Sequence, residues 1–524
     1  MSEDPAQVLM NACMARGVRD FVVCAGARNA PLVLALLDAE GVRVWNHFDE
    51  RSAGFFATGR SMDSGAPCAV VTTSGTAAAE LLPAMVEAHY QRRPLVAITA
   101  DRPERFRGSG APQAVEQAGI FGCYGEGGCD LGGADGVREP FSGWAGLGPW
   151  HVNVCLEEEH PVPEMRSGED GTVSRMPRPN VTSLVSFVRD GIFEGLAVLV
   201  GGLEPEEREE AFHFLKDLGV PVLADVTSGL REALGELSLV DGDRLLRENI
   251  PGKVLRLGDV PVGRFWRDLE NHPDVKVLSV TRTGFSGLAR ESELIIGRVD
   301  DAIRGMGPVG TVGDVQDHLP RSKRRGARIV ELLERFPDSE PGMVRLLSTY
   351  ASLGESLFLG NSLPIREWNL VGQRDSPMLD VRANRGANGI DGQISTWLGA
   401  TIAADDAWGV FGDLTALYDL AAPALLDQAG GRRRVLVVIN NGGGRIFERL
   451  PRMRGLEADA ADVMANAHGH RFDDWARMWG MDYLRVDSAA SFDFEPGERT
   501  TILELCPDRA QTEEFWIAYE DLGG

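Results

Sequence analysis

Long apolar segments, paired cysteines and positive charge are all scarce in this sequence. No segment approaches the ~18 consecutive apolar residues that a membrane span requires, and the first residues show no basic stretch followed by an apolar one. We therefore expect a cytoplasmic protein without a membrane span. The seven cysteines form no CxxC pair and their odd number argues against a disulfide framework, so we expect ordinary thiols.

Positive charge is in deficit, because 53 Lys and Arg residues face 78 Asp and Glu residues and give a net charge of −25. This balance disfavours non-specific binding to nucleic acid and to an anionic membrane surface. Most of the cations are arginines, so arginines in loops become candidates for binding anionic substrates. The proportions of hydrophobic residues, 43%, and charged residues, 25%, are typical of a folded globular protein.

The order of apolar runs predicts the fold class. A chain of 524 residues suggests three domains of roughly 100–200 residues, with two large domains as the alternative. Short apolar runs such as DFVVCAG, LAVLVGG and RRVLVVINN alternate with helical patterns, as in βαβ units with parallel strands. A polar segment rich in Pro and Gly, residues 157–180, indicates a linker, and the basic SKRRGAR ends the second unit. We therefore predict an α/β protein of three doubly wound parallel-sheet domains at residues 1–180, 181–340 and 341–524.

The most informative local pattern follows two apolar strands in the last third of the chain. Gly412-Asp413 ends one strand and Asn440-Asn441-Gly-Gly-Gly ends the next, with a helix predicted over 417–430 between them. In an open α/β sheet both turns would lie side by side at the carboxyl edge. Carboxylate, amide and backbone carbonyl oxygens suit Mg²⁺, with phosphate and water as its other ligands. Alternatively these are two ordinary turns, because Asp, Asn and Gly are common turn residues.

A second candidate is Glu50, which opens the helical pattern ERSAGFFATG. Its carboxylate can be a favourable charge at a helix N-terminus, worth ~0.3–1 kcal/mol. The apolar residues that follow also allow a raised pKa, at which a carboxylic acid exchanges a proton with a heterocyclic nitrogen. The sequence leaves both interpretations open.

Four arginines lie in loop-like positions after predicted strands. They are Arg28 in CAGARNAPL, Arg102 in TADRPERF, Arg366 in NSLPIREW and Arg385 in ANRGANGIDG. A single arginine of this kind is usually a surface or structural ion pair. Several at strand ends would suit a site that holds carboxylates through paired hydrogen bonds.

Together these features resemble thiamine-diphosphate enzymes, whose cofactor signature is Gly-Asp followed one crossover later by Asn-Asn. That superfamily has an N-terminal pyrimidine-binding domain, a central domain and a C-terminal domain for the diphosphate and Mg²⁺. Within it, the sequence is similar to the MenD family of menaquinone biosynthesis. The blocks that carry this resemblance are GARNAPL, DERSAGFFATG, TSGTAAAELLPA, TADRP, NSLPIR, NRGANGIDG, GDLTALYDL and NNGGGRIF.

The resemblance implies a transferase, a carboligase that decarboxylates 2-oxoglutarate and adds the resulting succinyl carbanion to isochorismate. The products would be 2-succinyl-5-enolpyruvyl-6-hydroxy-3-cyclohexene-1-carboxylate (SEPHCHC) and CO₂. It also implies thiamine diphosphate and Mg²⁺ (or Mn²⁺) as cofactors, and a homodimer or homotetramer with the cofactor at the subunit interface. Both substrates carry two carboxylates, which accounts for an arginine-rich site in an acidic protein.

The same resemblance implies roles for individual residues. Glu50 would be catalytic and contact the pyrimidine ring, and Ile390 would hold the cofactor in a bent conformation. The full cofactor-binding set is Glu50, Ile390, Gly412, Asp413, Asn441, Ile446 and Phe447. Asp413, the Asn441 side chain and the Gly443 carbonyl would bind the metal. The substrate-binding set is Arg28, Arg102, Gln113, Ser362, Arg366 and Arg385.

Three departures from the family pattern stand out. Ala27 replaces the usual Ser before the first arginine, which removes a hydroxyl contact to substrate. Arg264 is followed by Phe265 where two basic residues are expected, and the middle region offers otherwise only a weak match, LRLGDVPVGR. The last turn has Asn-Asn-Gly-Gly-Gly rather than three Asn, which should leave the metal ligands intact.

Two other functions compete with this interpretation. Another thiamine-diphosphate decarboxylase or carboligase, similar to acetohydroxyacid synthase, would share Glu50, Asp413 and Asn441 but would not need the four loop arginines. A non-catalytic α/β protein could keep the cofactor site for structure or regulation. Retention of both the glutamate and the metal ligands argues against the second alternative.

Overall fold

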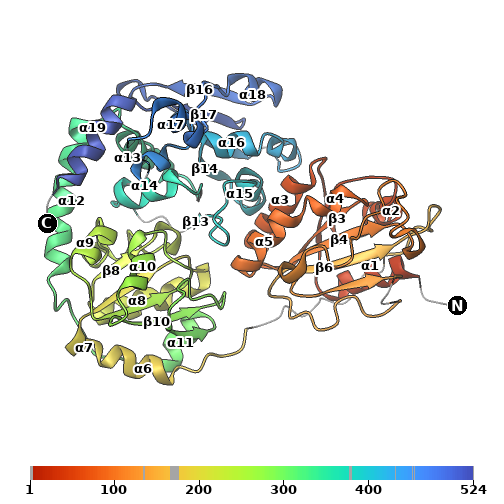
Figure 1. Ribbon diagram of the computed structural model, residues 1–524, viewed down its shortest axis with the longest axis horizontal. Helices are drawn as coiled ribbons and strands as arrows, with labels where there is room; N and C mark the ends of the chain where they lie inside the picture. Colours follow the sequence, from red (N-terminus) through yellow and green to blue (C-terminus); the bar gives the residue numbers. More distant parts are fainter. Residues whose placement is uncertain are drawn as a thin grey trace. The chain divides into compact units, whose positions relative to one another are not determined.

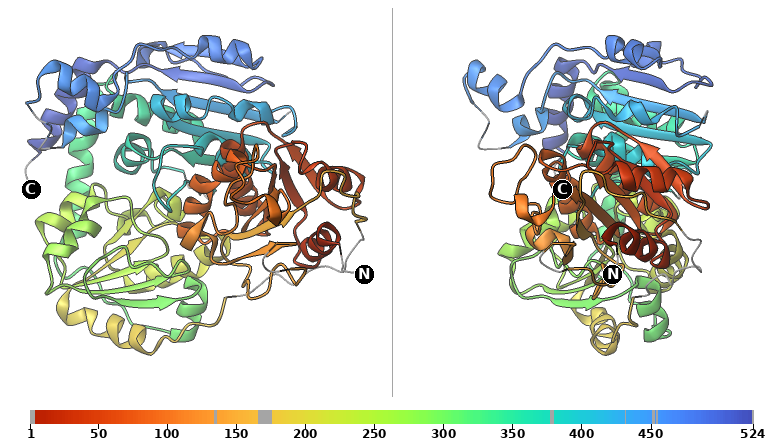
Figure 2. Two further views of the ribbon diagram at one scale, coloured as in Figure 1. Left: turned by 45° about the vertical axis from the view of Figure 1, so that its right-hand side comes forward. Right: turned by 90° about the vertical axis from the view of Figure 1, so that its right-hand side faces the viewer.

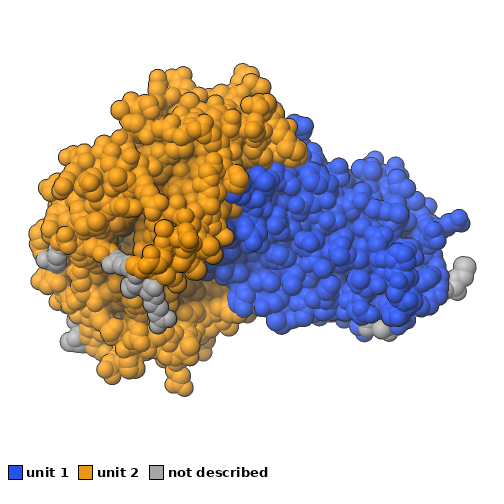
Figure 3. Space-filling model, turned by 45° about the horizontal axis from the view of Figure 1, so that its top comes forward, with its two compact units in different colours: residues 1–175, 384–404, 415–431 blue, residues 176–383, 405–414, 432–524 orange. Residues whose placement is uncertain are grey.

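The computed structural model describes residues 4–133, 136–165, 176–376, 380–430, 432–450, 453 and 455–522. It contains three sheets of parallel strands flanked by helices (Figure 1). The chain forms two compact units, residues 1–175, 384–404 and 415–431 in the first and residues 176–383, 405–414 and 432–524 in the second (Figure 3). Among the described helices, none combines the length and apolarity needed to cross a bilayer.

The first unit is built on a six-stranded sheet in the order β2-β1-β3-β4-β6-β5. Alternate strand residues such as Phe21 and Val23 pack against helices α1 and α2, while α3 contacts strands β1, β3 and β4 and α5 packs against α3. The sheet is therefore covered by helices on both sides, as a buried parallel sheet requires. The bounds are β1 Asp20–Val23, β2 Arg43–Asn46, β3 Cys68–Thr72, β4 Leu95–Asp101, β5 Gly128–Leu131, β6 Trp150–Cys155, α1 Pro5–Ala15, α2 Ala30–Asp38, α3 Glu50–Ser64, α4 Thr76–Ala79 and α5 Leu82–Gln91.

Helix α3 also packs closely against α15 (Gln393–Ala400), which belongs to the same unit. A Cβ atom at Gly59 would overlap the Thr396 carbonyl oxygen, and one at Gly399 would overlap the Phe56 carbonyl oxygen. Glycine is needed at both places because the two helix backbones approach each other directly. The crossing fixes α3, and with it the first turn of α3, which carries Glu50.

The second unit holds a five-stranded sheet in the order β11-β10-β9-β7-β8. Val198 and Leu255 face a core shared with α6, α8 and α11, and their neighbours Leu199 and Val254 face a separate core shared with α9 and α10. This alternation is the period of two expected of a strand covered on both faces. The bounds are β7 Leu196–Val200, β8 Val222–Ala224, β9 Lys253–Leu257, β10 Lys276–Thr281, β11 Glu293–Ile296, α6 Thr182–Arg189, α7 Gly191–Glu194, α8 Arg208–Leu218, α9 Gly242–Glu248, α10 Arg264–Asp268 and α11 Val299–Met306. The strands of this sheet can be followed between their helices in Figure 2.

The same unit holds a third sheet, six strands in the order β13-β12-β14-β15-β17-β16. Its core includes residues of α12, α13, α14 and α19, and the aromatic side chains Trp368 and Trp408 fill it. The bounds are β12 Ser356–Leu359, β13 Val381–Arg382, β14 Asp406–Gly412, β15 Arg433–Ile439, β16 Asp482–Val486, β17 Thr501–Leu505, α12 His318–Arg335, α13 Glu340–Ala351, α14 Leu363–Val371, α16 Asp413–Tyr418, α17 Ala458–Ala465, α18 Asp473–Met478 and α19 Arg509–Glu520.

The predicted α/β class with three parallel sheets is confirmed. The helix predicted over 417–430 is wrong in extent, because α16 ends at Tyr418 and only a short 3₁₀ turn, Ala422–Leu425, follows. Asp419 turns inward there to accept hydrogen bonds from Ser395 and Ser52, which interrupts a regular helix. The basic segment SKRRGAR lies within α12. Residues 166–175 of the predicted linker fall outside the described residues. The predicted domain boundaries at residues 180 and 340 stay a prediction.

Candidate active site

The Gly-Asp and Asn-Asn motifs lie at one edge of the third sheet. Strands β14 and β15 are parallel neighbours, and Gly412 pairs with Ile439 at their carboxyl ends. The side chains of Asp413 and Asn441 therefore follow adjacent strand ends. Ser362 follows β12, which pairs with the other side of β14, so it belongs to the same edge.

Asp413 is a buried carboxylate held by backbone amides. Its Oδ2 atom accepts hydrogen bonds from the nitrogens of Gly442 at 2.9 Å and Gly443 at 2.8 Å, and Oδ1 accepts from Leu414 at 2.6 Å. His468 Nε2 lies 3.3 Å from Oδ2. Burial raises the pKa of Asp413, and the amides and His468 oppose that rise.

The glycine turn after Asn441 cannot accept larger residues without strain. Gly442 and Gly443 have φ angles of 79° and 131°, in the region that favours glycine. A Cβ atom on Gly443 would also lie 2.5 Å from the Ala465 carbonyl oxygen. The turn thus directs two N–H groups at Asp413, while the Gly443 carbonyl accepts the Arg445 nitrogen at 2.9 Å.

The two asparagines have separate tasks. Asn440 donates from Nδ2 to Glu504 Oε1 at 2.6 Å and to the His470 carbonyl at 2.9 Å, which ties the turn to β17. Asn441 donates from Nδ2 to Glu340 Oε2 at 2.9 Å, and its buried Oδ1 finds no donor among the described residues. An unpaired buried amide oxygen beside a carboxylate and a carbonyl is a donor set that fits a hard divalent cation.

In the first unit, the predicted residues follow four neighbouring strands of its sheet. Glu50 follows β2, Arg28 follows β1 and Arg102 follows β4, and these strands lie in the order β2-β1-β3-β4. Ser74, after β3, accepts a hydrogen bond from Gln113 Nε2 at 3.4 Å. The structure thus brings Glu50, Arg28, Gln113 and Arg102 to one carboxyl edge, where open α/β sheets bind ligands.

Glu50 occupies the first turn of α3, after the N-cap residue Asp49, whose side chain accepts from the Ser52 nitrogen at 3.1 Å. Burial raises the pKa of Glu50, a backbone hydrogen bond at Glu50 itself opposes that rise, and the nearby carboxylates of Asp49 and Glu80 add to it. This environment favours the protonated form more than an exposed glutamate would. It is the setting that the sequence suggested for a proton-exchanging acid.

The two unit-one arginines at this edge are held by carbonyl oxygens. Arg28 donates from Nη1 to the Leu156 carbonyl at 2.9 Å, and Arg102 donates from Nε to the Pro112 carbonyl at 2.9 Å. Both residues are partly exposed. Ala27, the departure from the family pattern, is exposed beside Arg28.

Arg385 and Ile390 belong to a loop that precedes α15 in the first unit. Glu87 of α5 holds this loop, because its carboxylate accepts from the nitrogens of Gly386 and Ala387, both at 2.7 Å. Glu87 is almost fully buried, and burial raises its pKa. Sequence reasoning missed this residue, since a glutamate 300 positions from its partners carries no local signal.

Arg366, on α14, lines a cavity of about 230 Å³ within the second unit. Arg264, Arg374 and Arg449 also line this cavity, so Arg264, the middle-region arginine noted in the sequence, and the predicted substrate residue Arg366 line the same cavity. Phe265 instead lies buried in the core beneath α10. The expected second basic residue is therefore replaced by a core side chain.

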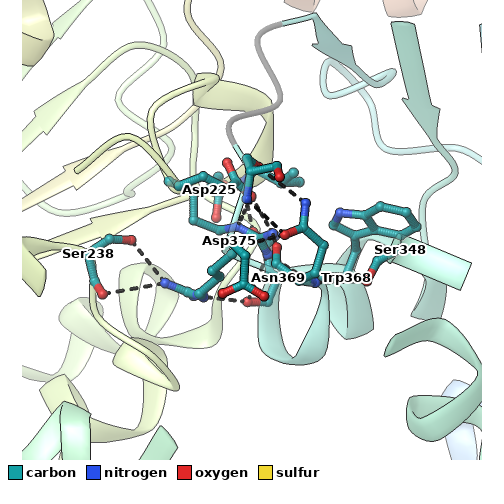
Figure 4. Close-up of polar contacts among 12 residues, drawn as sticks. Asp225, Ser238, Ser348, Trp368, Asn369 and Asp375 are labelled. Carbon is teal, nitrogen blue, oxygen red and sulfur yellow. Dashed lines mark hydrogen bonds and ion pairs between the residues drawn. The ribbon is translucent and has the colours of Figure 1, made fainter. Parts of the chain in front are cut away.

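A polar network fixes α14 and the residues after it. Asn369 accepts from the Val226 nitrogen at 2.8 Å, and Arg374 donates to Ser238 Oγ at 3.1 Å (Figure 4). Buried Arg231 donates to the Trp368 carbonyl at 2.5 Å and to the Gln373 carbonyl at 2.9 Å. These contacts join the second and third sheets and position Ser362 and Arg366. Arg366 Nη1 donates to the Ser362 carbonyl at 2.6 Å.

Ile446 and Phe447 follow the Asn-Gly turn in the sequence. They lie in the 3₁₀ segment Arg445–Arg449.

Comparison with known proteins defines the class. Residues 4–120 match the family model described as thiamine pyrophosphate enzyme, N-terminal TPP binding domain. With its three parallel α/β sheets, the fold is that of a thiamine-diphosphate enzyme, and the prediction of that cofactor is confirmed.

Relatives that align with most of the chain identify the family within this class. A protein of Akkermansia muciniphila is 48% identical to this chain, and the alignment covers 97% of this chain and 96% of the relative. A protein of Bdellovibrio bacteriovorus is 37% identical over 96% of each chain. A protein of Geobacillus thermodenitrificans is 33% identical over 84% of this chain and 81% of the relative. Each is named 2-succinyl-5-enolpyruvyl-6-hydroxy-3-cyclohexene-1-carboxylate synthase. The chain belongs to this family of enzymes. The alternative function, an acetohydroxyacid synthase-like decarboxylase or carboligase, is not favoured.

Proposed function

We propose that this protein makes SEPHCHC for menaquinone biosynthesis, by decarboxylating 2-oxoglutarate and adding the succinyl unit to isochorismate. The observation that carries the proposal is 48% identity, over 97% of the chain, to a synthase named for that product. The arginines at the sheet edges support it, because each substrate carries two carboxylates that guanidinium groups bind well.

The second unit would hold the diphosphate end of the cofactor and its metal. Asp413, the Asn441 amide oxygen and the Gly443 carbonyl offer three oxygen ligands for Mg²⁺ or Mn²⁺, and Gly412 ends the strand beside them. Ile446 and Phe447 follow the same turn and would line the cofactor cleft. Thiamine diphosphate, when bound, supplies the electron sink that decarboxylation of a 2-oxo acid requires.

The first unit would act on the pyrimidine ring and on the substrates. Glu50, with its raised pKa, would hold and return a proton at a ring nitrogen. Ile390 would support the bent cofactor from the loop that Glu87 fixes. Arg28, Arg102, Gln113 and Arg385 from this unit, and Ser362 and Arg366 from the other, would bind the carboxylates and exclude water.

The assembly would be a homodimer or homotetramer with the cofactor at the subunit interface. This part rests on resemblance to the superfamily, in which the pyrimidine-binding region of one subunit faces the diphosphate-binding region of its partner. Equilibrium sedimentation tests it, and a fully active monomer would contradict it.

The reaction is tested by incubating the protein with 2-oxoglutarate, isochorismate, thiamine diphosphate and Mg²⁺ and identifying the adduct by mass spectrometry. We expect the SEPHCHC mass and release of one CO₂ per adduct. Release of CO₂ from pyruvate in place of 2-oxoglutarate, with no isochorismate adduct, would instead support an acetohydroxyacid synthase-like activity.

A further inference from the structure

Two buried glutamates lie behind the Asn-Asn turn of the second unit. Glu340 begins α13 and Glu367 lies in α14, and they are 2% and 1% exposed. Neither belongs to the motifs that define the cofactor site. Their partners nevertheless connect them directly to a proposed metal ligand, Asn441.

Glu340 determines which way the Asn441 amide faces. Glu340 Oε2 accepts the Asn441 Nδ2 hydrogen at 2.9 Å. A carboxyl oxygen in this position accepts a hydrogen bond from the amide nitrogen, so the amide oxygen must point the opposite way. That oxygen, Oδ1, is buried without a donor among the described residues, as expected of an atom kept for a cation.

Glu367 and Arg449 lie beside Glu340. Arg449 Nη2 donates to Glu367 Oε1 at 2.6 Å, and its positive charge also attracts the Glu340 carboxyl group. Arg449 is itself packed on the Trp516 ring, 3.7 Å from its centroid. Glu340 Oε1 and Glu367 Oε2 are buried and have no hydrogen-bond partner among the described residues, so Oε2 is the Glu340 atom that contacts Asn441.

We propose that Glu340 is a positioning residue for the metal site, which holds the Asn441 amide so that its oxygen faces the divalent cation of the bound cofactor. The inference rests on the proposed function, because it assumes a metal at Asp413 and Asn441. Without Glu340, the amide could rotate by 180° and present its N–H₂ group to the cation. Outer partners that orient metal ligands typically contribute ~10–100-fold to metal affinity.

The test measures how much Mg²⁺ is needed for half-maximal binding of thiamine diphosphate, followed by tryptophan fluorescence. Glu340→Ala should raise that Mg²⁺ concentration by ~10–100-fold. Glu340→Gln should bind like the wild type, because its carbonyl oxygen can still accept from Asn441. In an Asn441→Ala background, Glu340→Ala should add little, since it acts through Asn441.

A matched control separates orientation from loss of stability. Glu207 is equally buried in the same unit and accepts the nitrogens of Val299 at 2.8 Å and Glu204 at 2.9 Å. Glu207→Ala should lower the melting temperature as Glu340→Ala does, and leave the Mg²⁺ requirement unchanged.

Three results would overturn the inference: unchanged Mg²⁺ dependence in Glu340→Ala, full additivity with Asn441→Ala, or a Glu340→Gln variant as weak as Glu340→Ala. If wild-type binding of thiamine diphosphate does not depend on Mg²⁺ at all, the proposed metal site fails and the inference fails with it. The wild-type titration therefore distinguishes the two failures.

Discussion

Glu50 and Asp413 are the two candidate carboxylates that follow strands of two different sheets, and their surroundings differ. Each carboxylate opens a helix after a parallel strand, and burial raises the pKa of both. Asp413 accepts three backbone N–H groups, and these together with His468 oppose the rise. At Glu50 one backbone hydrogen bond opposes the rise in pKa, and the neighbouring carboxylates of Asp49 and Glu80 add to it.

The comparison shows that position in the fold does not decide what a carboxylate does. Asp413 is held by fixed backbone donors, which suit an anion that would hold a metal. Glu50 has acidic neighbours and partial burial, which raise its pKa and suit a group that exchanges a proton. Four substitutions test this division of roles, ordered from the largest expected effect to the smallest.

Glu50→Gln should lower turnover by ~10²–10⁴, the usual contribution of one acid–base group. The amide keeps the shape of the side chain but cannot exchange the proton. Adduct formation under saturating substrates, followed by mass spectrometry, measures the effect. Near-normal carboligation would refute the role of Glu50.

Asp413→Asn should weaken the Mg²⁺-dependent binding of thiamine diphosphate by more than ~10–100-fold, the loss typical when a residue that only orients a metal ligand is removed. The effect is larger because a proposed direct metal ligand loses its charge. Isothermal titration in excess Mg²⁺ measures the change. Binding at wild-type affinity would show that Asp413 only caps its helix.

Gly443→Ala should destabilise the turn by ~1–3 kcal/mol, since it combines a strained φ of 131° with an overlap at the Ala465 carbonyl. Gly480→Ala is the matched control, because Gly480 has a φ of 66° and open space around its Cβ position. Thermal unfolding of both variants gives the difference. Equal losses would mean that the close approach at Ala465 is unimportant.

Glu80→Gln should move the acid limb of the kcat/KM profile to lower pH by less than ~1 unit. The sign follows because Glu80 raises the pKa of Glu50, so removing its charge lets Glu50 ionise at a lower pH. Glu40→Gln, at another exposed acid of the first unit, removes the same charge and should leave the limb in place. An upward shift in Glu80→Gln would contradict the electrostatic account.

The sequence predicts the sheets and the strand-end motifs well, because βαβ patterns and turn residues are local signals. Strand β5 was not predicted, since its GlyCysAsp segment has low β-propensity. Glu340 could not be recognised either. It follows Ser339 at the start of α13, where an acid ordinarily serves the helix dipole, and its partner Asn441 lies 101 residues away.

Glu87 and Asp419 escaped prediction for the same reason. Each carboxylate bonds to segments remote in the chain, Glu87 to Gly386 and Asp419 to Ser52, and only the folded packing brings them together. The helix expected over 417–430 failed because Asp419 bonds inward rather than continuing the helical surface. Buried carboxylates with distant partners are thus the part of the site that residue patterns do not reveal.

The most direct test titrates thiamine diphosphate, with Mg²⁺ present, into Glu50→Gln and Asp413→Asn side by side and then assays each for SEPHCHC. We predict that Glu50→Gln binds the cofactor close to wild-type affinity and forms little product, whereas Asp413→Asn fails to bind it. Tight binding by Asp413→Asn together with lost binding by Glu50→Gln would contradict the assigned roles.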